Sequence, residues 1–210
     1  MAFALLMIGV SVLGSAGDKS GINPEAGLSD SQRQALHDAA HARNSQFLHD
    51  FVAGGGDPRS LPVVLVESYG APPLTLADAL AESDAVVQGT VRGVTFADNP
   101  SGGMPLATAT VDVTRKFKGA IGSVITVRQL GGPVAQGTGG ALAEIDTDRL
   151  LLPGDEAILM LRIGTSGNFN TLPGAGVNLI KNGRVEAEAA NPFGLLFTGR
   201  TVDEVAKYLT

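Results

Sequence analysis

The sequence predicts a mainly β protein built around one small closed barrel, with a helical extension before the barrel and a helix after it. Two observations carry this prediction. Several short segments beyond position 84 alternate apolar and polar residues, as half-buried strands do. In the first of them, residues 85–97, the apolar parity reverses at Gly93, where a β-bulge would bend the strand as barrel closure requires.

The expected strands span residues 85–97, 106–117, 124–130, 156–163, 169–172, 177–180 and 185–187. The second alternates cleanly, so Val111 should face the interior and Thr110 the outside. The fourth, residues 156–163, is apolar on both parities and should be buried on both faces. Asn182-Gly183 joins the last two strands, and this pair is typical of the type I′ hairpin turn.

A long helix is expected before the barrel. Ser29 and Gln32 have the spacing of a capping box at the start of residues 30–52, and the three glycines at 54–56 end the helix. Its apolar residues recur at three- and four-residue steps, which is typical of a helix with one apolar stripe. The stripe comprises Ala35, Leu36, Ala39, Ala40, Phe47, Leu48, Phe51 and Val52.

Two shorter helices and one extended segment complete the pattern. Thr75 caps a short helix that ends near position 82, and Thr201 with Glu204 caps a final amphipathic helix. Residues 61–69 predict a short strand or an extended segment. The strands therefore form one block between helical ends.

Composition excludes several classes of function. The chain has 210 residues, no cysteine and a formal net charge of −6. Disulfides, thiolate metal sites and cysteine nucleophiles are therefore impossible, and a polyanion such as DNA would be repelled overall. No segment reaches the roughly 18 uninterrupted apolar residues of a membrane span. We expect no cofactor, no nucleic-acid partner and no membrane span after processing, and the oligomeric state stays open.

The first residues predict a secretory signal peptide. Residues 2–13 are apolar, and Gly14 and Ala16 supply the small side chains of a cleavage site after Ala16. No Lys or Arg precedes the apolar run, so a buried N-terminal helix is the alternative. The predicted division is a signal peptide at 1–16, a helical and linker extension at 17–73, the barrel at 74–187, and a C-terminal loop and helix at 188–210.

Four short motifs in the barrel resemble one known family. They are residues 83–87 with Gly89 and Val91, residues 115–119 (Arg-Lys-Phe-Lys-Gly), residues 125–127, and residues 152–159. Together they are similar to the strands of the netrin/TIMP-like OB-fold barrels and their bacterial secreted relatives, over about residues 74–163. The resemblance implies an OB-like closed barrel. The animal inhibitors act through an N-terminal cysteine, and this chain has none, so their mechanism is not carried over.

The glycine-rich stretch 131–140 predicts a flexible connection across one barrel end. It lacks the Gly-Lys-Ser/Thr ending of a phosphate-binding loop. Because variable loops on rigid strands commonly carry binding surfaces, this stretch and the loop at 98–105 are the candidate ligand contacts. The candidate residues are Met104, Gly131, Gly132, Gln136, Gly137, Thr138 and Gly139.

Two further clusters are weaker candidates. His37 and His41 stand one helical turn apart, as in zinc-binding helices, but a solvated histidine face explains them as well. Glu144, Asp146 and Asp148 alternate as calcium ligands would, although the glycine and terminal glutamate of an EF-hand are missing, so a solvated acidic stretch is favoured.

These observations predict an exported, non-enzymatic binding module of OB-like fold whose ligand is a protein, a glycan or an envelope component. The sequence offers no candidate for a Ser-His-Asp catalytic triad, because all three histidines lie on the first predicted helix. The alternatives are a metal-binding protein or metal-dependent hydrolase using the His37/His41 helix, and a purely structural envelope protein.

Overall fold

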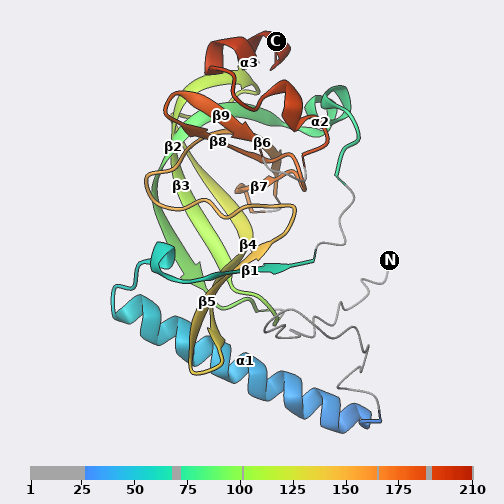
Figure 1. Ribbon diagram of the computed structural model, residues 1–210, viewed down its shortest axis with the longest axis vertical. Coiled ribbons are helices and arrows are strands. Elements are labelled where there is room, and N and C mark those ends of the chain that lie inside the picture. Colours follow the sequence, from blue (N-terminus) through green and yellow to red (C-terminus); the bar gives the residue numbers. More distant parts are fainter. Residues whose placement is uncertain (1–26, 68–71, 101, 165, 188–190, 210) are drawn as a thin grey trace.

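Five strands close a barrel at the centre of the molecule (Figure 1). The computed structural model describes residues 27–67, 72–100, 102–164, 166–187 and 191–209. The barrel strands are β2 (Ala85–Ala97), β3 (Leu106–Lys118), β4 (Val124–Gln136), β6 (Glu156–Ile163) and β7 (Phe169–Thr171). Their order is β4-β3-β2-β6-β7, and β7 returns to β4 in parallel. This is the connectivity of an OB barrel, so the predicted OB-like closed barrel is confirmed.

The bend in β2 lies where the parity reversal predicted it. The register between β2 and β3 shifts between Val91 and Gly93, which confirms an irregularity at this glycine. A second shift precedes Gly89, where an added Cβ would lie only 2.6 Å from a methyl carbon of Val111. Both glycines allow the long strand to coil around the barrel and approach β3 closely.

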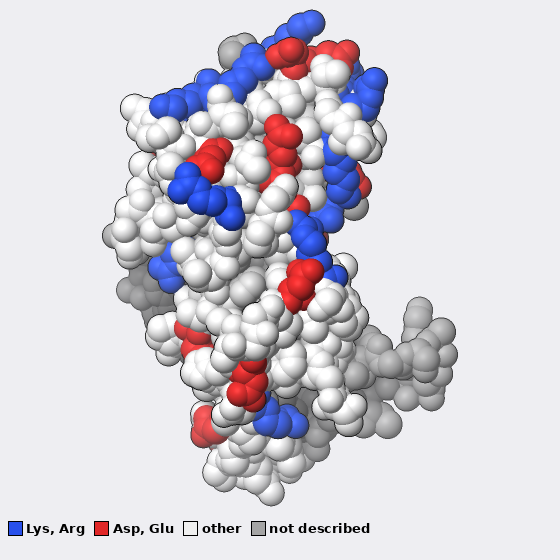
Figure 2. All heavy atoms as spheres, turned by 90° about the vertical axis from the view of Figure 1, so that its left-hand side faces the viewer, with Lys and Arg blue, Asp and Glu red and all other residues white. Residues whose placement is uncertain are grey.

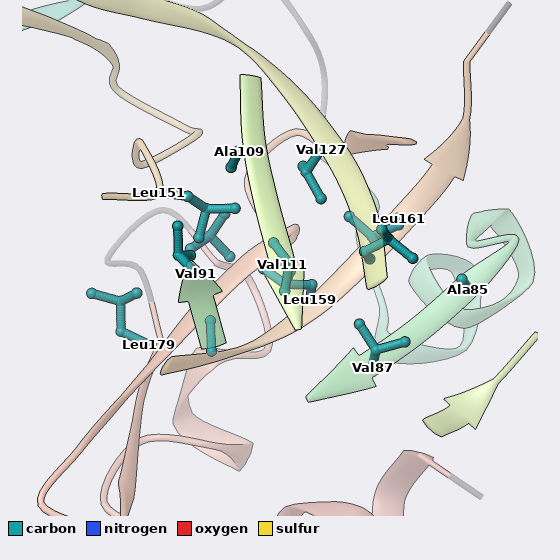
Figure 3. Close-up of a cluster of buried hydrophobic side chains, with 13 residues drawn as sticks. Ala85, Val87, Val91, Ala109, Val111, Val127, Leu151, Leu159, Leu161 and Leu179 are labelled. Atoms are coloured by element: carbon teal, nitrogen blue, oxygen red, sulfur yellow. The ribbon is translucent and has the colours of Figure 1, made fainter. Parts of the chain in front are cut away.

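The barrel interior is filled by aliphatic side chains from every barrel strand except the short β7 (Figure 3). The fully buried members are Ala85, Val87, Val91, Ala109, Val111, Ile125, Val127, Leu151, Ala157, Leu159, Leu161, Val177 and Leu179. Val111 is completely buried while Thr110 is partly exposed, as the alternation in β3 predicted.

A second core covers the outer face of the β2–β6 pair. It is contributed by α2 (Leu76–Glu82), β8 (Val177–Lys181), β9 (Arg184–Ala187), α3 (Val202–Leu209) and the two phenylalanines, Phe193 and Phe197, that flank η2 (Gly194–Leu196). Ile158 and Met160 of β6 face this core, whereas Leu159 faces the barrel interior. The prediction that this strand is buried on both sides is therefore confirmed.

The hairpin turn and the helix cap that the sequence predicted are both present around this second core. Asn182 and Gly183 have φ values of 52° and 73°, so the turn between β8 and β9 is built as expected. The Oγ1 of Thr201 accepts a hydrogen bond from the backbone N–H of Glu204, whose carboxylate in turn accepts from Thr201 N–H. An ion pair of 2.6 Å between Arg115 and Asp203 ties α3 to β3.

The glycine-rich stretch 131–140 is not a loop, so that prediction is wrong. β4 continues to Gln136 and pairs with β5 (Gly139–Ile145), which leaves a tight turn at the tip of this hairpin. Several of the glycines are needed for close approach. A Cβ at Gly131 would lie 2.6 Å from the carbonyl oxygen of Ala143, and one at Gly132 would lie 2.9 Å from the Phe96 ring. Glycine here provides space for neighbouring strands rather than flexibility.

The extended segment before the barrel forms β1 (Val63–Val66). It pairs in parallel with β5, and this places it at one end of the sheet that runs from β1 to β9. The short 3-10 helix η1 (Pro58–Ser60) precedes it. Residues assigned by sequence to the N-terminal extension thus join the barrel's own sheet.

The long helix α1 (Asp30–Ala53) crosses beneath the β4–β5 hairpin (Figure 1). Its capping box at Ser29 and Gln32 is confirmed. The predicted helix is present, but most of its apolar stripe is not buried: Leu48 is the buried residue of the helix, and Leu36 is 55% exposed. The reason is that α1 packs against a narrow hairpin instead of a broad sheet.

The remaining predictions concern the signal peptide and a membrane span. The predicted signal peptide and its cleavage site after Ala16 lie outside the described residues. Within the described ranges, no helix combines the length and the apolar character needed to cross a bilayer.

Candidate binding site

The residues predicted to contact a ligand divide between the interior and the hairpin tip. Met104, Gly131 and Gly132 are buried, Gln136 is half-buried, and Gly137, Thr138 and Gly139 are exposed at the turn. The structure does bring the two candidate loops together, because the N–H of Gly131 donates to the carbonyl of Pro105 at 2.9 Å. Their buried members, however, hold strands together and are not open to a ligand.

The chain's own α1 covers part of this barrel end. The Oγ of Ser45 donates to the Asp98 carboxylate at 2.8 Å, and Nε2 of His49 lies 3.0 Å from the same carboxylate oxygen. The Asn44 side chain accepts from the backbone N–H of Ala135 at 3.2 Å. The surface that the sequence assigned to a ligand is thus partly an internal contact.

The histidine pair lies on α1, at some distance along the helix from these contacts. His37 is half-buried and His41 is exposed. Nε2 of His37 is buried without a hydrogen-bond partner. Among the residues that the structure describes, no group of three or more His, Cys, Asp or Glu side chains could hold a metal ion.

A cavity of about 230 Å³ lies between η1, β1, β5 and the segment at 149–155. We call it the Glu144 pocket. Its lining combines an aliphatic floor with four charged groups, and its residues are Pro58, Arg59, Leu61, Val63, Leu142, Glu144, Arg149, Leu150, Leu152 and Asp155. The sequence analysis named Glu144 only as a weak calcium candidate and did not predict this pocket.

Glu144 is the central polar group of the pocket. It is only 8% exposed, and in β5 it pairs in register with Leu65 of β1. Burial raises the pKa of its carboxyl, while the positive charge of Arg149 lowers it and Asp155 raises it. In the described ranges, neither Glu144 nor the Arg149 guanidinium forms a hydrogen bond or an ion pair within 4.0 Å. The pocket therefore presents an acceptor and a donor that are both unused.

The rim of the pocket is held firmly. Nη2 of Arg59 donates to Oδ1 of Asp155 at 2.8 Å and to the carbonyl of Pro153 at 2.9 Å. Oδ2 of Asp155 accepts from the backbone N–H of Leu152 at 2.8 Å. These bonds join segments 96 residues apart in the sequence, so the walls of the pocket do not depend on a flexible loop.

Asp148 directly precedes the pocket residue Arg149, and its carboxylate accepts two hydrogen bonds. It accepts hydrogen bonds from Nε2 of Gln129 at 3.1 Å and from Oγ1 of Thr171 at 2.6 Å. Burial raises its pKa to about 6, against the lowering effect of these two hydrogen bonds. The expectation of a solvated acidic stretch is therefore wrong for Glu144 and Asp148, and of the three carboxylates only Asp146 is exposed.

Sequence reasoning placed Glu144 in a solvated acidic stretch and did not single out Arg149. Glu144 directly continues the apolar run Ala141-Leu142-Ala143, and a charge at the end of such a run is a usable sign of a buried polar group. Arg149 follows no pattern. It meets Glu144 only because β5 and the chain that follows it fold back over one cavity.

Two comparisons with known proteins found no match for this chain. No protein-family model matches the chain, and no curated protein matches it. The pocket and the sheet around it are therefore the features of the molecule that bear on its function.

Proposed function

We propose that this chain is an exported, non-enzymatic binding module whose OB-like barrel offers the Glu144 pocket to one polar group of a protein, glycan or envelope component. The observation that carries the proposal is the pair of unused groups, Glu144 and Arg149, in a cavity with firm walls. The Glu144 carboxylate is partly desolvated, no described protein group donates a hydrogen bond to it, and it opens onto a cavity, so its position points to a function for it.

The size of the cavity supports one group of a larger molecule as occupant. Its volume of about 230 Å³ lies below the roughly 300–1,000 Å³ of sites that enclose whole small molecules. The volume is suited to one side chain or one sugar ring. The formal charges in the pocket cancel, because Arg59 and Arg149 balance Glu144 and Asp155. A neutral group that both donates and accepts hydrogen bonds is the best complement.

The remaining parts of the proposal rest on sequence. Export follows from the apolar run and small residues before position 17, and kinship with the netrin/TIMP-like barrels follows from the four strand motifs. A non-catalytic role agrees with a chain that has no cysteine and carries every histidine before position 50. The net charge of −6 and the mixture of basic and acidic side chains on the face in Figure 2 argue against a polyanion as the ligand.

A single conservative substitution tests the pocket. Residues 17–210 would be measured by biolayer interferometry against a panel of immobilised glycans, envelope polymers and folded envelope proteins. For any panel member that binds, we expect Glu144→Gln to weaken binding by at least about tenfold, because the carboxylate acceptor is lost. The neutral amide should not destabilise the fold, since burying it costs less than burying a charge.

Glu67→Gln is the matched control, because Glu67 is exposed and lies just after β1 outside the pocket lining. It should bind as the wild type does. Equal binding by the Glu144→Gln protein, or no binding by the wild type to any class in the panel, would contradict the proposal.

A further inference from the structure

One edge of β1 pairs with no strand among the residues that the structure describes. The N–H of Leu142 donates to the carbonyl of Pro62, and the N–H of Asp146 donates to the carbonyl of Val66, each at 2.9 Å. In a parallel ladder alternate residues bond to the same neighbour, so Val64 and Val66 face β5. The N–H and C=O groups of Val63 and Leu65 therefore point away from β5, and no described strand pairs with them.

The four residues of this edge include no lysine and no proline, and their pairing with β5 contains no bulge. Exposed edge strands are normally blunted by lysine, proline or a bulge, because their free backbone groups otherwise attract another strand. Residues 63–66 are Val-Val-Leu-Val, with Val63 54% exposed and Leu65 65% exposed. An apolar edge with free backbone groups is the surface to which extended peptides add as a further strand.

The Glu144 pocket lies directly beside the free edge, because β1 contributes one of its lining side chains. Val63 pairs in register with Leu142, and all three of Val63, Leu142 and Glu144 line the cavity. A strand added beside β1 would lie about 4.8 Å beyond it. Its side chains on the pocket side would project over β1, and a long one could reach the Glu144 carboxylate and the Arg149 guanidinium.

We propose that an extended peptide segment of a partner protein pairs with β1 and places a neutral donor-and-acceptor side chain, such as glutamine, between Glu144 and Arg149. This inference rests on the proposed function, because it names the partner of the same pocket. A primary amide donates to the carboxylate and accepts from the guanidinium, so it satisfies both unused groups without adding charge to a pocket whose charges already cancel.

The same chemistry argues against a second copy of this chain on the edge. Pairing β1 with another β1 would bring only valine and leucine side chains to the pocket. Glu144 and Arg149 would then remain without partners, now under a covered surface, and their desolvation cost would rise.

The edge can be tested at one backbone atom. Leu65→Pro removes the outward N–H of residue 65 and leaves the bonds to β5, which are made by its neighbours. Leu65→Thr is the matched control, because it removes the apolar side chain and keeps the N–H. Circular dichroism and thermal unfolding of both variants establish that the barrel is folded.

Short random peptides displayed on phage would be selected on the wild-type protein, and enriched peptides would be synthesised for calorimetric titration. We expect enriched peptides to share an extended sequence with a glutamine or asparagine. Leu65→Pro should weaken their binding by about tenfold or more, and Leu65→Thr by less than about threefold. Replacing the peptide's amide residue by alanine should weaken binding to the wild type but not to the Glu144→Gln protein.

Three outcomes would overturn the inference. They are equal binding to the wild type and to the Leu65→Pro protein, no peptide enriched on the wild type, and a wild-type dimer in light scattering that Leu65→Pro abolishes. The last outcome would assign the edge to a second copy. If no peptide binds while a glycan or envelope polymer still binds through Glu144, the inference fails and the proposed function stands.

Discussion

Asp148 shows how one side chain sets a dependence on pH. Its carboxyl is buried beneath the junction of β4 and β7 and titrates in the folded protein with a pKa of about 6, against an ordinary value of 3.8. Between these two values the folded protein holds a proton that the unfolded chain has released. The free energy of unfolding that depends on Asp148 therefore falls as the pH rises from about 4 to about 6, and it changes little above that range.

Replacing Asp148 with asparagine should remove this loss. At pH 3.5 the Asp148→Asn protein should be about as stable as the wild type, because the aspartate is then protonated. At pH 7.5 it should be more stable by up to about 3 kcal/mol, the free energy of a shift of roughly two pKa units. Urea unfolding followed by circular dichroism at the two pH values measures the difference.

Asp38→Asn, on the exposed side of α1, is the control for this experiment. Its difference from the wild type should stay within about 0.5 kcal/mol at both pH values. A constant difference between the Asp148→Asn protein and the wild type across the pH range would show that burial does not govern this carboxyl.

At the scale of elements, the docking of α1 on the β4–β5 hairpin depends on one missing side chain. A Cβ at Gly140 would lie only 2.0 Å from the ring of Phe47, and that ring stacks on Phe51 with centroids 6.0 Å apart. The φ of Gly140 is not positive, so a substitution there acts through contact alone. The hairpin thus contains a notch into which the helix places an aromatic ring.

Gly140→Ala should displace Phe47 and loosen α1. We expect a destabilisation of about 1–3 kcal/mol, as for other overpacked contacts, and faster hydrogen exchange in the second half of α1. Gly139→Ala is the control, since the nearest atom to its added Cβ is a carbonyl oxygen 4.0 Å away. In a Phe47→Ala background the Gly140→Ala substitution should cost little. Equal exchange in the two alanine variants would show that the notch does not hold the helix.

The elements that sequence predicted well are those set by their own residues. The capping box at Ser29, the hairpin turn at Asn182-Gly183 and the doubly buried β6 each depend on residues that are neighbours in the chain. The bounds of β6 agree with the prediction at both ends. Local hydrogen bonding and alternation are sufficient to fix such features.

The elements that sequence missed depend on distant neighbours. Gly132 resembles a loop residue until Phe96 and Pro105 are seen to fill the space beside it. The Glu144 pocket exists because β1 pairs in parallel with a strand nearly 80 residues later in the chain, and no local pattern encodes that crossing. The fold class could therefore be predicted from sequence, whereas the candidate site could not.

At the scale of the whole molecule, two hydrophobic cores share the strands β2 and β6. Leu159 belongs to the barrel interior, and Val205 of α3 belongs to the outer core. Because Leu159 and its neighbours Ile158 and Met160 belong to one strand, loss of either core should expose the other. The helix after the barrel is then part of one cooperative unit rather than an appendage.

Alanine substitutions in the two cores test this unity. Leu159→Ala should cost about 2–5 kcal/mol and Val205→Ala about 1–3 kcal/mol, the ranges for removing fully buried aliphatic groups. Each variant should unfold in a single transition that is the same by circular dichroism and by hydrogen exchange. An earlier separate transition in the Val205→Ala protein would show that α3 and its core melt independently.

The shortness of β7 has a consequence for the order in which we expect the barrel to assemble. β2, β3 and β4 follow one another as hairpins and can pair as soon as they are synthesised, since the loops between them are short. β7 offers only three residues, and its parallel pairing joins Phe169 to Val127 across a long stretch of chain. We therefore expect ring closure to follow the docking of β6 and to come late in folding. The same seam, between β4 and β7, is where the native ring should first open.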